Sequence, residues 1–271
     1  VNNVIQSNLT AAQYFNSTYQ FNSFDTDGIT VTDDAAGNYG FNGNNETYVA
    51  WNWKAGGTAV SNTDGSITSQ VSANVNAGFS IVKYTGNGAA QTIGHGLDSA
   101  PEMYIVKSLS TGNWWTYHKG LNGGVNPSHY FIRLDLPNAE SFNASSGGSI
   151  FNSTEPTSTV FSGGTTINTS NDFIAYAFHS VDGYSKIGSY TGTGTSGNFV
   201  YTGFQPRFVL VKPTYSDSWR IVGFNGTYEL RPNSSGAESN NNVLTINPTG
   251  FTLNTADANN NGGGIIFLAI A

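Results

Sequence analysis

Cysteine is absent from the 271-residue chain. Its absence excludes disulfide bonds, thiolate ligands for zinc or iron–sulfur clusters, and thiol nucleophiles. Charged residues are scarce, at 10 % of the chain, against about 25 % in average globular proteins. The 10 Lys and Arg residues are outnumbered by 17 Asp and Glu residues, so the net charge is −7. This balance argues against binding to nucleic acid or to an anionic membrane surface, because both need clustered positive charge.

Long hydrophobic runs are also missing. The longest apolar run, Ile265 to Ala271, is far shorter than the roughly 18 residues of a membrane-spanning helix. We therefore expect no insertion into a membrane. Helical periodicity is nearly absent too, and Asn8 to Phe15 is the one segment that could form a helix. Aromatic residues, by contrast, make up 13 % of the chain, which argues against disorder because disordered segments have few residues to bury.

Short runs of β-branched and aromatic residues, bounded by Gly, Asn and Asp, make up most of the sequence. This pattern is typical of an all-β fold with many turns. Apolar and polar residues alternate over 28–32 and 250–254, which places one face of each strand inward and a Thr-rich face outward. Further strands are expected at 79–84, 103–106, 130–134, 173–178, 199–201, 208–211, 219–222 and 265–270.

An internal repeat is the strongest signal in the sequence. The run GFSIVKYTGNG at 78–88 returns as GYSKIGSYTGTG at 183–194. In both copies the same elements follow in the same order: a strand after proline, a strand with tryptophan, and an apolar closing strand. These elements lie at 101–107, 114–117 and 173–178 in the first copy and at 206–212, 219–222 and 265–270 in the second. A repeated pattern of turns and inward residues predicts a repeated fold.

The repeat predicts tandem β-sandwich-like modules. Residues 78–182 would form one module and residues 183–271 a second, shorter one, with a trimmed loop after its tryptophan strand. Residues 1–55 resemble the closing half of a further module, and residues 56–77 are a connector rich in Gly, Ser, Thr and Asn. The spacing does not fit a β-propeller, whose blades are about 40–50 residues long.

Candidate catalytic and metal-binding residues form no recognisable motif. The four histidines lie at turns and strand ends, outside any His-Glu-x-x-His or His-x-His arrangement: His95, His118, His129 and His179. The acidic run Asp25 to Gly28, with Asp33 and Asp34, fits an Asp-capped turn better than a Ca²⁺ loop. We therefore predict no catalytic residue, metal site or cofactor, and no enzyme. A pair among Glu102, Asp135, Glu140 and Glu155 would be needed for glycoside hydrolysis.

Aromatic side chains are the first candidates for recognition. In the strand 114–117, Trp115 and Tyr117 share one face and Trp114 lies on the other. One face is expected in the core. The other would serve as a sugar-stacking platform or a subunit interface, because both use aromatic side chains. Burial of both tryptophans in the core is the alternative that we favour.

A second candidate is the apolar strand expected from Tyr48 to Trp53, in which Trp51 and Trp53 share a face. Half a sandwich leaves the edge and one face of such a strand without a partner. The partner could be the module at 78–182, an upstream segment of a longer protein, or a neighbouring subunit. We favour a neighbouring subunit, so Tyr48, Trp51 and Trp53 are predicted to mark an assembly strand.

Several separated motifs resemble a module found in tail and other structural proteins of bacteriophages, notably marine and cyanobacterial ones. The motifs are SITSQVSAN at 66–74, GFSIV at 78–82, GHGL at 94–97, YTGFQPRFV at 201–209 and YVAWNWK at 48–54. The resemblance covers roughly residues 24–271. It implies a virion surface or fibre protein, and no catalytic residues come with it.

We therefore expect a virion structural or adhesive protein, such as a tail fibre or another surface-projecting component. Its repeated β modules would assemble into an oligomer at the virion surface or outside the cell and present loops to the host. Its partners would be other copies of itself, other virion proteins, and a host surface glycan or protein. The alternatives are a polysaccharide-binding or polysaccharide-degrading module and a bacterial surface filament or adhesin. A degrading enzyme would need a cleft with two close carboxylates.

Overall fold

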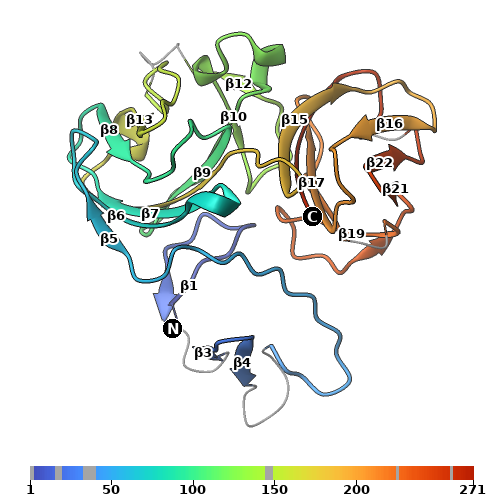
Figure 1. The fold of residues 1–271 in the computed structure, drawn as a ribbon, viewed down its shortest axis with the longest axis horizontal. Coiled ribbons are helices and arrows are strands. Elements are labelled where there is room, and N and C mark those ends of the chain that lie inside the picture. The colour runs from blue at the N-terminus through green and yellow to red at the C-terminus, as the bar shows by residue number, and fades with distance from the viewer. Residues whose placement is uncertain (1–2, 16–19, 33–40, 144–148, 224–225, 257–258) are drawn as a thin grey trace.

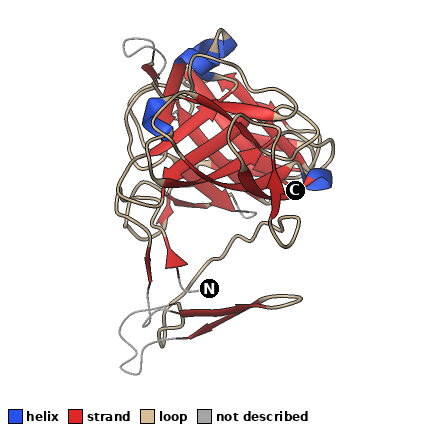
Figure 2. Cartoon of the chain, turned by 90° about the vertical axis from the view of Figure 1, so that its left-hand side faces the viewer, coloured by secondary structure: helices blue, strands red, loops and turns tan. Residues whose placement is uncertain are grey.

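The structure is a computed structural model that describes residues 3–15, 20–32, 41–143, 149–223, 226–256 and 259–271. Within these residues the regular elements are antiparallel β-strands and short 3₁₀ turns, so the prediction of an all-β fold is confirmed (Figure 2). The 3₁₀ turns are η1 (Val75–Ala77), η2 (Leu121–Gly124), η3 (Pro127–His129) and η5 (Thr165–Ile167).

An eight-stranded sheet has the strand order β12-β11-β10-β9-β14-β7-β6-β5. Its strands are β5 (Val60–Asn62), β6 (Ser69–Asn74), β7 (Phe79–Thr85), β9 (Met103–Ser108), β10 (Trp114–His118), β11 (Tyr130–Arg133), β12 (Ser141–Phe142) and β14 (Asp172–Phe178). A two-stranded sheet, β8 (Gln91–Gly94) with β13 (Val160–Gly163), accompanies it. Tyr84, Tyr104 and Phe161 belong to an apolar core built from strands of both sheets. Residues 56–77, expected as a connector, contain β5 and β6 of the large sheet.

A six-stranded sheet has the order β15-β23-β17-β18-β19-β20. Its strands are β15 (Ser185–Thr191), β17 (Phe208–Pro213), β18 (Arg220–Gly223), β19 (Tyr228–Leu230), β20 (Ser239–Asn240) and β23 (Gly264–Ile270). A three-stranded sheet, β16 (Asn198–Tyr201), β22 (Gly250–Leu253) and β21 (Leu244–Asn247), accompanies it. Val211, Phe251 and Phe267 belong to the apolar core that these strands share.

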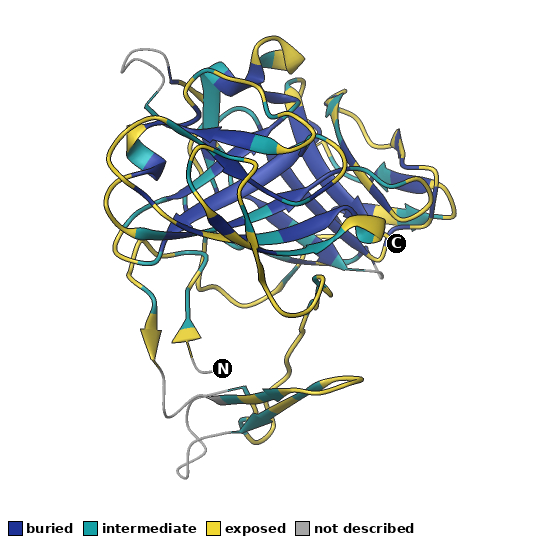
Figure 3. Ribbon diagram, turned by 60° about the vertical axis from the view of Figure 1, so that its left-hand side comes forward, coloured by how far each residue is buried: buried dark blue, intermediate teal, exposed yellow. Residues whose placement is uncertain are grey.

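The two large sheets also pack against each other and share a third apolar core (Figure 3). The eight-stranded sheet contributes Phe79, Met103, Ile105, Trp114, Ile132 and Phe178, and the six-stranded sheet contributes Phe208, Leu210, Ile266, Leu268 and Ile270. Both faces of each large sheet are thus buried at its centre. This explains why β9 and β17 are buried at every residue, whereas a strand with one wet face would alternate.

The N-terminal region adds two small antiparallel pairs. One is β1 (Asn3–Val4) with β2 (Tyr14–Phe15), and the other is the hairpin of β3 (Gln20–Phe24) and β4 (Ile29–Thr32), which lies apart from the large sheets (Figures 1 and 2). The prediction of a helix from Asn8 to Phe15 is wrong, because this segment contains no helix and ends in β2. The backbone there bonds to a neighbouring loop instead: the Gln13 amide donates to Leu109 O, and Thr10 O accepts from the Gly112 amide.

The strand expected from Tyr48 to Trp53 is also wrong, because residues 41–59 contain no strand. Side chains of β6 hold the extended backbone just beyond it: Asn74 Nδ2 donates to Lys54 O at 2.9 Å, and Ser72 Oγ donates to Gly57 O at 2.6 Å. This segment is therefore fixed by side-chain bonds and ring packing rather than by a strand ladder.

Candidate functional site

Strand β10 carries the predicted recognition aromatics, and it buries them on both faces. Trp114 belongs to the core between the large sheets, and Tyr117 belongs to the core under β8 and β13. The expected alternation is thus present, but neither Trp114 nor Tyr117 is available as a stacking platform, since each is about 95 % buried or more. The Tyr117 hydroxyl donates to Glu155 Oε2 at 2.6 Å, and burial raises its pKa.

Trp115 differs from its neighbours because it is half-buried at the rim of a pocket. The pocket has a volume of about 250 Å³ and lies where β9 ends and β10 and β14 begin. Phe131 meets the Trp115 ring edge-on at 5.1 Å, and the Arg133 guanidinium lies 5.8 Å from the ring centre. Thr111, Asn113 and Thr166 line the same pocket. Sequence reasoning missed these polar residues, because only the fold brings 111–113 next to 166.

Trp51 and Trp53 lie on the seam between the two large sheets. Their rings meet Phe208 of β17 at centroid distances of 5.7 and 5.2 Å in edge-to-face geometry. Together with Trp114 they line an apolar cavity of about 580 Å³ between the sheets. The structure therefore brings three of the predicted aromatics together, and Tyr48 stays exposed outside the cavity.

The N-terminal residues 5–9 lie across the same seam. Trp114 Nε1 donates to Gln6 O and to Leu9 O, both at 3.1 Å, and Ser7 Oγ donates to Pro232 O at 2.7 Å. Ile5 packs on the core beneath. This segment bridges the two sheets, and its contacts leave the cavity lined almost wholly by apolar side chains, so the cavity offers packing rather than acid–base chemistry.

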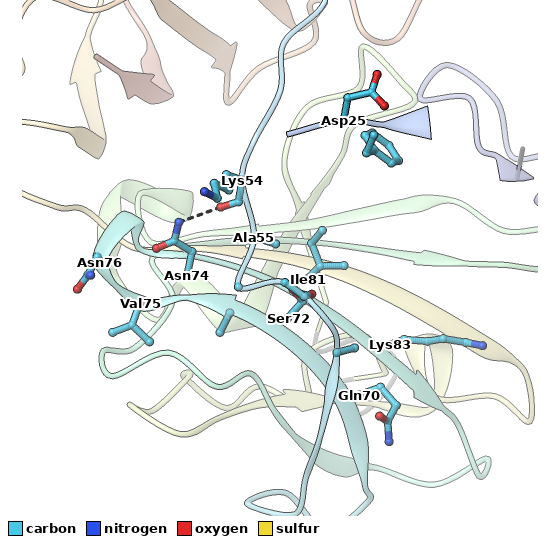
Figure 4. A pocket seen from close by; sticks show the side chains of 15 residues that line it. Asp25, Lys54, Ala55, Gln70, Ser72, Asn74, Val75, Asn76, Ile81 and Lys83 are labelled. Atoms are coloured by element: carbon cyan, nitrogen blue, oxygen red, sulfur yellow. Dashed lines mark hydrogen bonds between the residues drawn. The ribbon is translucent and has the colours of Figure 1, made fainter. Parts of the chain in front are cut away.

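A larger and more polar space of about 1130 Å³ lies between hairpin β3–β4 and strands β6 and β7 (Figure 4). Its lining has one carboxylate, Asp25, which accepts hydrogen bonds from Thr30 and Ser23, both at 2.7 Å. The hydroxyls of Thr30 and Ser23 lower the pKa of Asp25. These contacts are those of an Asp-capped turn, and the predicted companions Asp33 and Asp34 lie outside the described residues.

The four carboxylates considered for glycoside hydrolysis each have a separate structural partner. Glu102 binds Lys119 Nζ at 2.5 Å and the Ser180 amide at 2.9 Å, and these bonds outweigh its burial, so its pKa is lowered. Asp135 accepts a hydrogen bond from the Trp114 amide, Glu140 from the Asn122 amide, and Glu155 from the Ser128 amide. Among the described residues, no group of three or more His, Asp or Glu side chains could hold a metal ion.

Ring nitrogens of three histidines lie within hydrogen-bonding distance of backbone groups: His95, His118 and His179, the last with Nδ1 2.9 Å from Ser180 O. The His129 ring instead lies against Phe142, at a centroid distance of 6.4 Å. His95 is buried, with Nδ1 accepting from the Leu97 amide and Nε2 near Thr157 O. His118 is buried at the seam, where Nδ1 accepts from the Gly120 amide at 2.9 Å and Nε2 donates to Phe267 O at 3.2 Å. Since Nδ1 faces an N–H donor, a proton cannot be added there without losing that bond. Burial lowers the pKa of His118 to about 4.

This low pKa predicts acid sensitivity. The folded protein accommodates His118 in its neutral form, whereas the unfolded chain protonates it near pH 6.5. The contribution of His118 to stability is therefore fully present above about pH 6.5 and is lost as the pH falls toward 4. We expect the free energy of unfolding to fall by about 2 kcal/mol between about pH 7 and about pH 5. His118→Gln keeps an N–H donor for Phe267 O but cannot titrate. Urea unfolding should show a smaller loss in this variant, and an equal loss in both proteins would contradict the assignment.

A buried charge network that the sequence did not indicate lies at β18 and β19. Glu229 Oε2 is 2.8 Å from Arg220 Nε, and Glu229 Oε1 is 2.9 Å from an Arg231 nitrogen. Asp217 lies 3.3 Å from Arg220 Nη1. The Glu229 side chain is fully buried, so the network is closed to a substrate and its bonds hold the sheet edge.

The fold and these sites define an all-β protein of antiparallel sheets joined by a shared apolar core. The chain belongs to the family described as "Domain of unknown function (DUF7483)", whose sequence profile matches residues 1–271. No curated protein and no solved structure matches the chain significantly. In the part of the chain that the structure describes, no helix is long and apolar enough to cross a membrane.

Proposed function

We propose that this chain is a non-catalytic structural or adhesive component of a virion, such as a tail fibre or another surface-projecting part, and that it works as an oligomer outside the cell. The observation that carries the proposal is the exposed N-terminal region. Phe15 and Phe24 are 70 % and 73 % exposed on strands of two small pairs. A two-stranded pair is marginal by itself, so another copy of the chain or another virion protein would supply the missing contacts.

The bonding of the carboxylates supports a non-catalytic role. A hydrolase needs one carboxylate free to donate a proton and a second within about 5–10 Å of it. Glu102 is instead tied to a lysine, and Glu155 to a buried tyrosine and a backbone amide. Such bonds fix loops in place, and rigid loops suit a protein that presents a surface.

We also propose that residues 78–182 and 183–271 are two copies of one sandwich-like module. The supporting observation is that equivalent residues pair in the same register. Val106 lies opposite Ala175 in the first copy, and in the second copy the equivalent Val211 lies opposite Phe267, the equivalent of Ala175. The orders β12-β11-β10-β9-β14-β7 and β20-β19-β18-β17-β23-β15 correspond strand by strand.

Buried polar contacts correspond as well. Lys107 Nζ donates to the carbonyls of residues 108 and 110, and Lys212 Nζ donates to those of residues 213 and 215. The amides of Gly88 and Gly194, both with positive φ, donate to Asn168 O and Asn260 O. The half-module assigned to residues 1–55 stays a prediction.

Light scattering tests the oligomer. We expect the full chain to have a mass that is a multiple of 28.7 kDa. A combined Phe15→Ser, Phe24→Ser, Val49→Ser variant should be monomeric and still folded, because these side chains are exposed and the contacts of Trp51 and Trp53 remain. Its unfolding midpoint should fall only by the contribution of the lost subunit contacts. The matched control, Phe199→Ser with Tyr201→Ser, removes exposed aromatics from β16 and should keep the oligomer.

A monomeric wild-type chain would overturn the assembly role. A measurable turnover of polysaccharides by the purified chain would overturn the non-catalytic role. The first outcome leaves the second unaffected, so the two parts of the proposal are tested separately.

A further inference from the structure

We propose that the pocket at Trp115 binds a single neutral sugar ring, and this deepens the proposed adhesive function by naming a site and a ligand class. The pocket is formed at one end of the eight-stranded sheet. Register places Trp115 opposite Val106 on β9, and Ser108 at the end of β9 opposite Phe173 on β14. The turn around η5 brings Thr166 to the same place. Three separate segments thus converge on one small concave surface.

Trp115 differs from the buried Trp114 and Trp219 in the hydrogen bonding of its indole N–H. Trp114 and Trp219 donate from Nε1 to backbone carbonyls, Trp114 to Gln6 O and Trp219 to Arg133 O at 2.8 Å. The Trp115 Nε1–H has no acceptor among the residues that the structure describes, and it is not a buried orphan, so it is open to solvent. A ligand acceptor could therefore reach it without displacing a protein bond.

The polar side chains around Trp115 are also available. The side chains of Thr111, Asn113 and Thr166 make no hydrogen bond to another residue that the structure describes, and none of their polar atoms is buried without a partner. Asn171 is already oriented, since its Nδ2 donates to Thr169 Oγ1 at 3.0 Å. An amide and two hydroxyls offer both donors and acceptors.

This combination fits a sugar better than other small ligands. A pyranose has a C–H face that packs on an aromatic ring and hydroxyls that both donate and accept hydrogen bonds. No charged side chain lines the pocket, and the nearby Arg133 guanidinium already lies over the Trp115 ring, 5.8 Å from its centre, which argues for a neutral ring. A volume of about 250 Å³ lies below the roughly 300–1,000 Å³ of sites for larger ligands, so one ring fits rather than a chain of several.

The experiment uses the full chain and the methyl glycosides of glucose, galactose, mannose and N-acetylglucosamine, with methyl glucuronide as the charged comparison. Saturation-transfer NMR detects binding, and a titration gives the affinity. We expect at least one neutral glycoside to bind. Trp115→Ala should weaken it about tenfold or more, and Asn113→Ala and Thr166→Ala should each weaken it less. Tyr201→Ala, which removes an exposed aromatic elsewhere, should leave the affinity unchanged.

Binding by none of the neutral glycosides would overturn the proposal, and so would unchanged affinity in Trp115→Ala and in the two polar variants. Tighter binding of methyl glucuronide than of every neutral glycoside would overturn the neutral ligand class. Asn113 and Thr166 lie outside the β-strands, so their alanine variants are expected to fold. If Trp115→Ala does not fold, the affinities of these two variants still test the site. An intact oligomer without sugar binding would refute this site and leave the proposed assembly role standing.

Discussion

Trp219→Ala should lower the free energy of unfolding by about 3–5 kcal/mol. Trp219 precedes β18, is 1 % exposed, and fills the core between the two large sheets. Its Nε1 donates to Arg133 O on β11, so the side chain joins the six-stranded sheet to the eight-stranded one by packing and by a hydrogen bond. Alanine would leave a cavity at the seam and an unpaired carbonyl.

Two further variants separate these contributions in urea unfolding measurements. Trp219→Phe keeps much of the ring but loses the N–H, so it should cost about 1–3 kcal/mol through the unpaired Arg133 carbonyl and the lost volume. Trp53→Ala serves as the comparison, because Trp53 is only half-buried against Phe208 and should cost less than Trp219→Ala. A cost below about 1 kcal/mol for Trp219→Ala would show that the seam contributes little to stability.

Strand positions were largely predictable because they depend on local pattern. The run expected at 173–178 is β14, Asp172–Phe178, and the alternation of Trp114 with Trp115 and Tyr117 is present. The packing of one large sheet against the other was not predictable. Whether a strand is buried on both faces or on one is decided by long-range contacts. In addition, β9 and β17 each contain a lysine, Lys107 and Lys212, and lysine is a residue type that is mostly exposed.

The N-terminal segment shows a different limit. Tyr48 to Trp53 alternates as a strand does, because an extended loop that buries every second side chain has the same pattern. Trp51 and Trp53 are packed on Phe208 while Ala50 and Asn52 are exposed, but no ladder forms. The candidate pocket at Trp115 was equally hidden. Trp115 itself was named from its sequence, whereas Thr166 joins it only through the pairing of β9 with β14.

Glu229→Gln should also lower the free energy of unfolding by about 3–5 kcal/mol, because it removes one charge from a buried network. The Glu229 carboxylate is fully buried between Arg220 and Arg231, and Asn241 Nδ2 donates to it at 2.9 Å. Glutamine keeps the shape but leaves Arg220, 8 % exposed, with Asp217 as its remaining charged partner at 3.3 Å. A buried guanidinium without sufficient negative charge is costly.

The exposed pair Lys83–Asp172, at 3.1 Å with both side chains about half exposed, provides the matched control. Asp172→Asn should cost at most about 1 kcal/mol, because water already solvates both charges. Raising the salt concentration should reduce the effect of Asp172→Asn further and leave that of Glu229→Gln nearly unchanged, since buried pairs are screened little. Equal costs for the two variants, measured by urea unfolding at low salt, would contradict a closed network at Glu229 and would indicate that water reaches β18 and β19.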